Sequence, residues 1–137
     1  MESVRTIKKG DTTYAMFFSH GLSKPGVQFL TPPTEPLQLG LMEHPAGHSV
    51  KPHQHVPQPF DVDRMCEFLY IEKGKVRAKV FDEDWNELGE QILEGGDFLL
   101  FLHSGHGIDI LEPTRMIEVK QGPFPGDKQS KIFQNQE

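Results

Sequence analysis

Histidine is concentrated in one stretch of this sequence, and two of these histidines have the spacing of a metal-binding pair. His53 and His55 stand in the run Lys51-Pro-His-Gln-His55. Side chains at i and i+2 of a β-strand point to the same face, so both imidazoles can bind one ion. Imidazole is a ligand for zinc, copper, iron and nickel. The competing interpretation of a lone His-x-His pair is a solvated strand edge.

Glu67 is the carboxylate that could join this pair. It is the second residue of the expected strand 66–72, where it shares a face with Leu69 and Ile71 and so points toward an apolar interior. A buried carboxylate needs a partner, although Glu67 as a surface acid is the alternative. The other face of this strand is also apolar, which suggests that it too is covered, for instance by a partner subunit. The residues on that face are Cys66, Phe68 and Tyr70.

His106 is the expected fourth ligand. It lies in Ser104-Gly-His-Gly107, directly after the hydrophobic run 97–102. The flanking glycines allow a sharp turn of the backbone, so that His106 can return to the interior. His103, at the end of the same run, could replace His106 or support it from outside.

Length and composition describe the scaffold that must position these residues. The chain has 137 residues with 13 glycines and 11 prolines, which favours one domain of many short strands. A net charge of -6 gives no general attraction for nucleic acid or an anionic membrane. The chain has a single cysteine and no apolar leader, which suggests a cytoplasmic protein. It also has no apolar run near the roughly 20 residues that a membrane span requires.

Alternating apolar residues and turn signals predict the strands. The first 36 residues are expected to form an arm of strands, 12–18 and 26–31, which ends at Pro32-Pro-Thr-Glu-Pro36. Residues 37–120 are expected to form the barrel core, and 126–137 a polar tail that Ile132 and Phe133 could dock. The segment between His55 and Cys66 is expected to be a long loop. The core strands are predicted at 37–43, 49–55, 66–72, 75–81, 90–93, 97–103, 107–111 and 115–121.

These residues and their order resemble the cupin superfamily. The first cupin motif corresponds to Gly47, His53, His55, Glu67 and Gly74, with a longer gap than usual between His55 and Glu67. The second motif is matched in part, by Gly96 and by Ser104-Gly105-His106. The resemblance covers about residues 37–120 and implies a double-stranded β-helix, or jelly roll, that holds one divalent metal and often forms a homodimer. The runs 37–44, 50–55 and 116–124 are also similar to small single-domain cupins associated with sugar biosynthesis.

Three histidines and one carboxylate would leave two positions open on a six-coordinate ion. We therefore expect a metal-dependent, isomerase-like enzyme that binds a small oxygenated molecule such as a sugar, sugar acid or keto-acid, with zinc, iron, manganese, nickel or copper as the metal. The alternatives are a cupin-type dioxygenase and a non-catalytic binding or sensor module. Candidate acid-base residues are His44, His103, Tyr70 and Lys51.

A second polar feature lies on the expected strand 75–81. Arg77 and Lys79 alternate there with apolar residues, which is typical of a strand with one face in water. Should that face line the pocket instead, the two cations would bind an anionic sugar or nucleotide.

Overall fold

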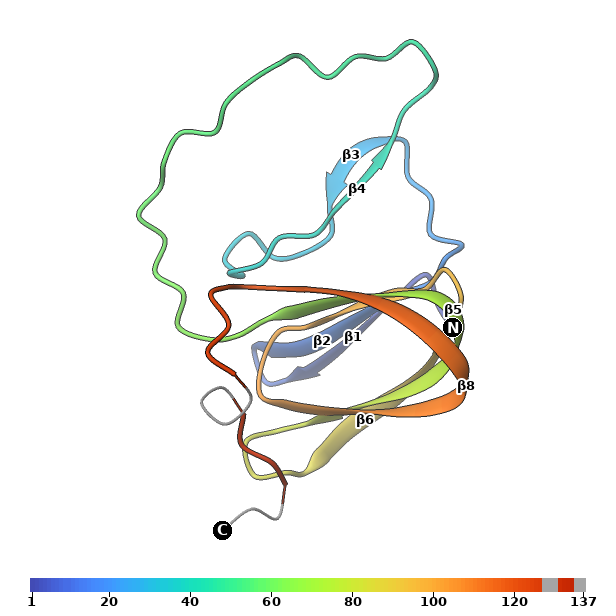
Figure 1. Cartoon of the computed structure of the whole chain (residues 1–137), viewed down its shortest axis with the longest axis vertical. Helices are drawn as coiled ribbons and strands as arrows, with labels where there is room; N and C mark the ends of the chain where they lie inside the picture. Colours follow the sequence, from blue (N-terminus) through green and yellow to red (C-terminus); the bar gives the residue numbers. More distant parts are fainter. Residues whose placement is uncertain (127–130, 135–137) are drawn as a thin grey trace.

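The computed structural model describes residues 1–126 and 131–134, and within these residues it is built of strands and loops without a helix (Figure 1). The all-β prediction is therefore confirmed. None of the described segments forms a helix that could cross a membrane. The strands are β1 (Val4–Lys9), β2 (Thr12–Phe18), β3 (Gly26–Phe29), β4 (Gly40–Glu43), β5 (Glu67–Phe81), β6 (Glu87–Glu94), β7 (Phe98–Phe101) and β8 (Gly105–Lys120).

One curled antiparallel sheet forms most of the molecule. Its strand order is β1-β2-β7-β5-β6, and β8 pairs with β5. The first half of β5 pairs with β7 and the second half with β6, while β8 follows β5 along nearly its whole length. The sheet therefore curls into a half-barrel (Figure 1). A separate two-stranded sheet, β3 with β4, lies beside it.

β5 and β8 are each a single long strand where the sequence predicts two. The expected turns at 73–74 and 112–113 are instead bends, and the register between β5 and β8 shifts three times between Ile71 and Val76. Gly74 has a φ of 103°, and a Cβ on it would lie 2.5 Å from the carbonyl oxygen of Pro113. The glycine thus lets the two bent strands approach closely, and the bend redirects β5 from β7 to β6.

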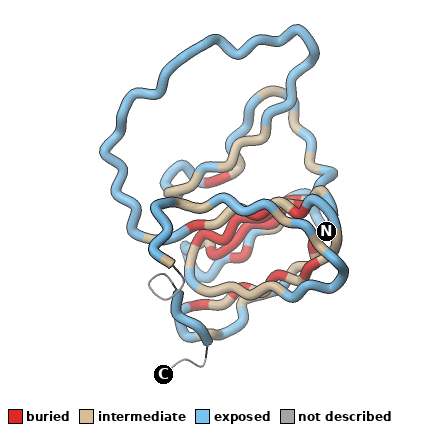
Figure 2. The backbone as a smooth tube through the Cα atoms, in the orientation of Figure 1, coloured by how far each residue is buried: buried red, intermediate tan, exposed pale blue. Residues whose placement is uncertain are grey.

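Both faces of the sheet carry buried residues, which Figure 2 marks in red. The inner face carries a cluster that includes Phe17, Leu69 and Ile71. The outer face carries a second cluster that includes Phe18 and Cys66. Leucines from the segment between β2 and β4 pack on this outer cluster, so residues 66 and 68 do not depend on a partner subunit for their cover. These leucines are Leu22, Leu30, Leu37 and Leu39.

The N-terminal strands belong to the main sheet. The predicted strand 12–18 is β2, whose partners are β1 and β7, and its Phe17 and Phe18 are fully buried. Strand β1 was not predicted from the sequence. The expected strands 26–31 and 37–43 are shorter and appear as β3 and β4, which pair with each other.

Residues 44–66, here called the excursion, leave the end of β4 and return to the start of β5 in a wide path (Figure 1). The strand predicted at 49–55 is not formed, and residues 44–63 are exposed. Pro52 stands in the middle of that stretch and has no N–H to donate to a ladder. Arg64 fixes the return, because its Nε donates to the carbonyl oxygen of Leu102 at 2.7 Å and its Nη2 pairs with Glu35.

Candidate functional site

The Glu67 carboxylate and the His106 imidazole lie within hydrogen-bond distance at the inner face of the half-barrel. His106 Nε2 lies 3.0 Å from Glu67 Oε2, and the two side chains are 29% and 13% exposed. Glu67 is the first residue of β5, and His106 lies near the start of β8, opposite Val80. Leu69 and Ile71, on the face predicted for Glu67, are buried in the inner cluster. The alternation read from the sequence therefore gives the correct orientation of Glu67.

The surroundings of this pair favour an ionised carboxylate. The hydrogen bond from His106 lowers the pKa of Glu67, and the nearby Lys120 ammonium adds to the effect against the opposing influence of burial. Lys120 Nζ lies 4.0 Å from Glu67 Oε1. The ring of Phe101 stacks on His106 with centroids 3.8 Å apart and planes 4° from parallel. Phe101 thus fixes the plane of the His106 ring, and Glu67 fixes the direction in which its Nε2 points.

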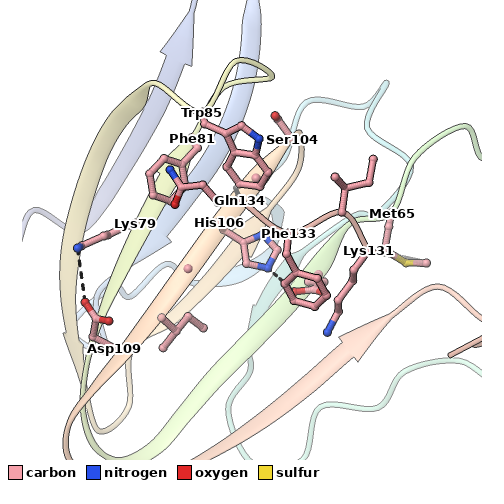
Figure 3. Close-up of a pocket in the computed structure, with 15 residues that line it drawn as sticks. Met65, Lys79, Phe81, Trp85, Ser104, His106, Asp109, Lys131, Phe133 and Gln134 are labelled. Carbon is pink, nitrogen blue, oxygen red and sulfur yellow. Dashed lines mark ion pairs between the residues drawn. The ribbon is translucent and has the colours of Figure 1, made fainter. Parts of the chain in front are cut away.

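The pair lines a pocket of about 610 Å³, a size typical of small-molecule sites (Figure 3). Its walls come from the second half of β5, the turn 82–86, the start of β8 and residues 131–134. Ile132 and Phe133, the two residues expected to dock the tail, line the pocket but remain 81% and 57% exposed. Residues 127–130 and 135–137 of that tail lie outside the described residues. The other named lining side chains include Lys79, Phe81, Trp85, Ser104 and Asp109.

His53 and His55 form a second pair, in the exposed excursion. Their ring centroids lie 5.2 Å apart with an angle of 60° between the planes. Because metal–imidazole bonds are about 2.0–2.1 Å, two rings at this separation can bind one ion. His53 Nδ1 lies 2.7 Å from the carbonyl oxygen of Lys51, which leaves Nε2 as the ligating nitrogen. The adjacent imidazoles thus arise from a coil rather than from the predicted strand.

The four expected ligands are therefore brought together as two pairs. Within residues 1–126 and 131–134, no group of three or more histidine, cysteine, aspartate or glutamate side chains is arranged to hold a metal ion. His106 lies beside Glu67, whereas His103 lies beside Glu83.

His103 belongs to a different cluster. Its Nε2 lies 2.9 Å from Glu83 Oε1, and its ring meets Tyr14 edge to face at 5.1 Å. The Tyr14 hydroxyl donates to both oxygens of Glu83 at 3.0 Å. The pKa of Tyr14 is raised, first by burial and then by its bond to Glu83. The cluster joins β2 to the turn after β5.

The remaining acid-base candidates lie apart from the pocket pair. His44 stacks on His48 in the excursion, with centroids 3.9 Å apart, and Lys51 is exposed in the same segment. Tyr70 lies on β5, opposite Phe98 of β7 and out of phase with Glu67. Neither Tyr70 nor these excursion residues line the pocket that holds Glu67 and His106.

Arg77 and Lys79 of β5 lie close to carboxylates of the neighbouring strands β6 and β8. Asp109 Oδ2 lies 3.7 Å from both Arg77 Nη1 and Lys79 Nζ, and Arg77 also lies 3.9 Å from Glu90. Lys79 and Asp109 line the pocket, as Figure 3 shows. The pocket thus has a charged end in addition to the Glu67–His106 pair.

Two pocket residues were not singled out from the sequence, namely Trp85 and Ser104. Trp85 is the only tryptophan of the chain and stands in the turn 82–86. A large apolar side chain gains no stability from exposure to water in a turn, so its presence there was a usable sign of a residue that lines a pocket. Ser104 gave none, because serine is common in turns.

The geometry supports two kinds of chemistry. A carboxylate bonded to an imidazole can hold or move a proton at the pocket wall, and the same two groups can serve as metal ligands. Comparisons with protein-family models, with curated proteins and with solved structures give no significant match for this chain. The function therefore has to be argued from the site.

Proposed function

We propose that this chain is a metal-binding protein of the double-stranded β-helix type, a cupin, that acts as a metal-dependent enzyme on a small oxygenated molecule. Its ligands are His53, His55, Glu67 and His106. The observation that carries this proposal is the Glu67–His106 pair, a carboxylate and an imidazole 3.0 Å apart at the wall of a pocket of about 610 Å³. A divalent transition metal suits this donor set of three imidazoles and one carboxylate.

Assembly of the site requires the excursion to move toward the half-barrel. Residues 56–66 link His55 to Glu67. Because Arg64 fixes the return, only residues 56–63 act as a flexible linker. A linker of this length has a root-mean-square span of about 14–17 Å and a maximum of roughly 29 Å. The tether thus permits His55 to reach the pocket without any change in the barrel.

The edge of β8 offers a place for the incoming segment. Among the described residues β8 pairs with β5 alone, so its other edge is open to a further strand. The excursion exposes 63% of Val50 and 74% of Val56, and burial of these side chains would favour closure. A segment 49–55 added to β8 would also restore the i, i+2 relation of His53 and His55.

In the closed site the chain's own residues would orient the ligands. The Lys51 carbonyl oxygen accepts from His53 Nδ1, Phe101 holds the ring of His106, and Lys120 lies beside the carboxylate of Glu67. Outer partners of this kind fix ring orientation and tune ligand basicity. The metal would supply a Lewis acid that polarises a carbonyl or hydroxyl oxygen of the substrate.

Metal analysis of the purified protein tests the proposal. We expect about one equivalent of zinc or another divalent metal after supplementation and dialysis, and a large loss in His53→Ala and in Glu67→Gln. His48→Ala removes a neighbouring exposed imidazole and should leave the metal content unchanged. Less than about 0.2 equivalents in the parent protein, or equal metal in the parent and His53→Ala, would contradict the proposal.

A further inference from the structure

The wall of the pocket contains both non-glycine residues with a left-handed backbone in the described part of the chain. Trp85 has a φ of 65° and Ser104 a φ of 61°. Residues with side chains rarely adopt this conformation, and such positions cluster at sites that bind ligands. The two residues come from different turns, and both line the pocket next to the Glu67–His106 pair.

Trp85 is held at this wall by a well-bonded turn. Asp82, which is buried, accepts hydrogen bonds from the backbone N–H of Asp84 at 3.0 Å and of Asn86 at 2.9 Å, and it pairs with Lys9 at 3.0 Å. The indole meets the ring of Phe81 at 5.9 Å with an angle of 60°. The turn thus fixes the backbone that presents Trp85.

The residue opposite the indole has to be small. A Cβ on Gly105 would lie 3.0 Å from a carbon of the Trp85 ring, so the ring lies close over the backbone between Ser104 and His106. Figure 3 shows Trp85 and Ser104 beside each other at one end of the pocket, with His106 next to them. An aromatic surface, a hydroxyl group and an imidazole therefore face one space.

We propose that Trp85 and Ser104 form a ring-binding subsite for a hydroxylated ring molecule. The apolar face of the ring lies on the indole, one hydroxyl bonds to Ser104, and an adjacent hydroxyl points toward Glu67 and His106. Burial of a ring face on an aromatic side chain supplies affinity, and the few polar groups fix the orientation. This inference rests on the proposed function, because it names the substrate class of the same pocket.

The single tryptophan provides a direct readout. Its indole N–H gives one resonance in a ¹H–¹⁵N spectrum of uniformly labelled protein. The probes are cis-1,2-cyclohexanediol and ethylene glycol, which share the diol and differ in the ring. Each is titrated into metal-free and into zinc-supplemented full-length protein.

We expect cyclohexanediol to shift the indole resonance saturably and to bind at least about tenfold more tightly than ethylene glycol, because only the ring buries apolar surface. Trp85→Ala, followed through the amides of Gly105 and Gly107, should lose this preference, and Trp85→Phe should regain part of it. Ser104→Ala should weaken diol binding roughly two- to tenfold. Phe29→Ala, which truncates an exposed aromatic of β3, is the matched control and should behave as the parent protein.

Equal affinity for the two diols, or an unchanged preference in a folded Trp85→Ala variant, would overturn the subsite. The titration of metal-free protein separates this outcome from failure of the metal proposal. A ring preference in protein that binds no zinc supports the subsite alone, whereas zinc binding without a ring preference overturns the subsite and leaves the metal site intact.

Discussion

The two histidine-containing pairs should be energetically coupled, since each alone offers a metal only two side chains. The variant His53→Ala/His55→Ala removes the excursion pair, and Glu67→Gln/His106→Ala removes the pocket pair. When one pair has bound the ion, the tether 56–63 presents the other within about 14–17 Å, an effective concentration in the millimolar range or higher. Intramolecular delivery of this kind raises affinity by about 10²- to 10⁴-fold.

Loss of either pair should therefore weaken zinc binding by about 10²- to 10⁴-fold, which corresponds to roughly 3–6 kcal/mol. Competition with a chelator of known affinity measures the two dissociation constants, and circular dichroism confirms that both variants fold. His48→Ala serves as the control, because it removes an imidazole of the excursion outside the proposed ligand set.

A full parent affinity in either variant would refute the reasoning. If the Glu67→Gln/His106→Ala variant binds zinc as tightly as the parent protein, the excursion binds metal alone and the two pairs form no common site. If instead the His53→Ala/His55→Ala variant keeps the parent affinity, the excursion has no part in the site. A substantial loss in both variants is the result consistent with one ion held by both pairs.

Three further predictions concern stability. The ammonium of Lys9 and backbone donors lower the pKa of Asp82 from 3.8 to about 2. The stability that the ionised Asp82 contributes is therefore present above pH 3.8 and is lost as the pH falls toward 2. Over that range the melting temperature of Asp82→Asn should fall less steeply than that of the parent protein. Gly74→Ala should lower the free energy of unfolding by about 3 kcal/mol or more in urea titrations. Gly10→Ala is the control, because φ is also positive there but no atom lies near the new Cβ, and it should cost about 1–2 kcal/mol. Equal costs would contradict the close approach of β5 and β8 at Gly74. Leu100→Ala should cost about 2–5 kcal/mol in the same titration, because its side chain is fully buried, and a loss under 1 kcal/mol would contradict that burial.

The sequence predicts the main strands well wherever the alternation of side chains is anchored by a buried face. Glu67 is an example, because Leu69 and Ile71 on its face are both buried. Turn signals are less reliable. Gly74 was interpreted as the end of a strand, but in the structure it is the bend within β5, since a glycine that relieves a close contact and a glycine in a turn look alike in one sequence.

The candidate site could be predicted only in part. The closeness of Glu67 and His106 was expected, and in the structure it depends on the pairing of β5 with β8. The position of His53 could not be read in the same way, because the excursion contributes no buried residue up to position 63 and nothing in its pattern fixes a register. Trp85 lies in a turn, where periodicity gives no information on side-chain direction.

The pairing of β5 with β6, β7 and β8 also has a kinetic consequence. β5 and β6 are adjacent in sequence and form a local hairpin, whereas β2 must find β7 across about 80 residues, a closure typical of slow all-β folding on the millisecond-to-second scale. The excursion lies within that long connection. Since closure entropy grows only with the logarithm of length, removal of about 15 residues would change the barrier by roughly 0.2 kcal/mol. The folding rate of the half-barrel should thus depend very little on the length of the excursion. That length can therefore vary with what the site requires, without a cost in folding rate.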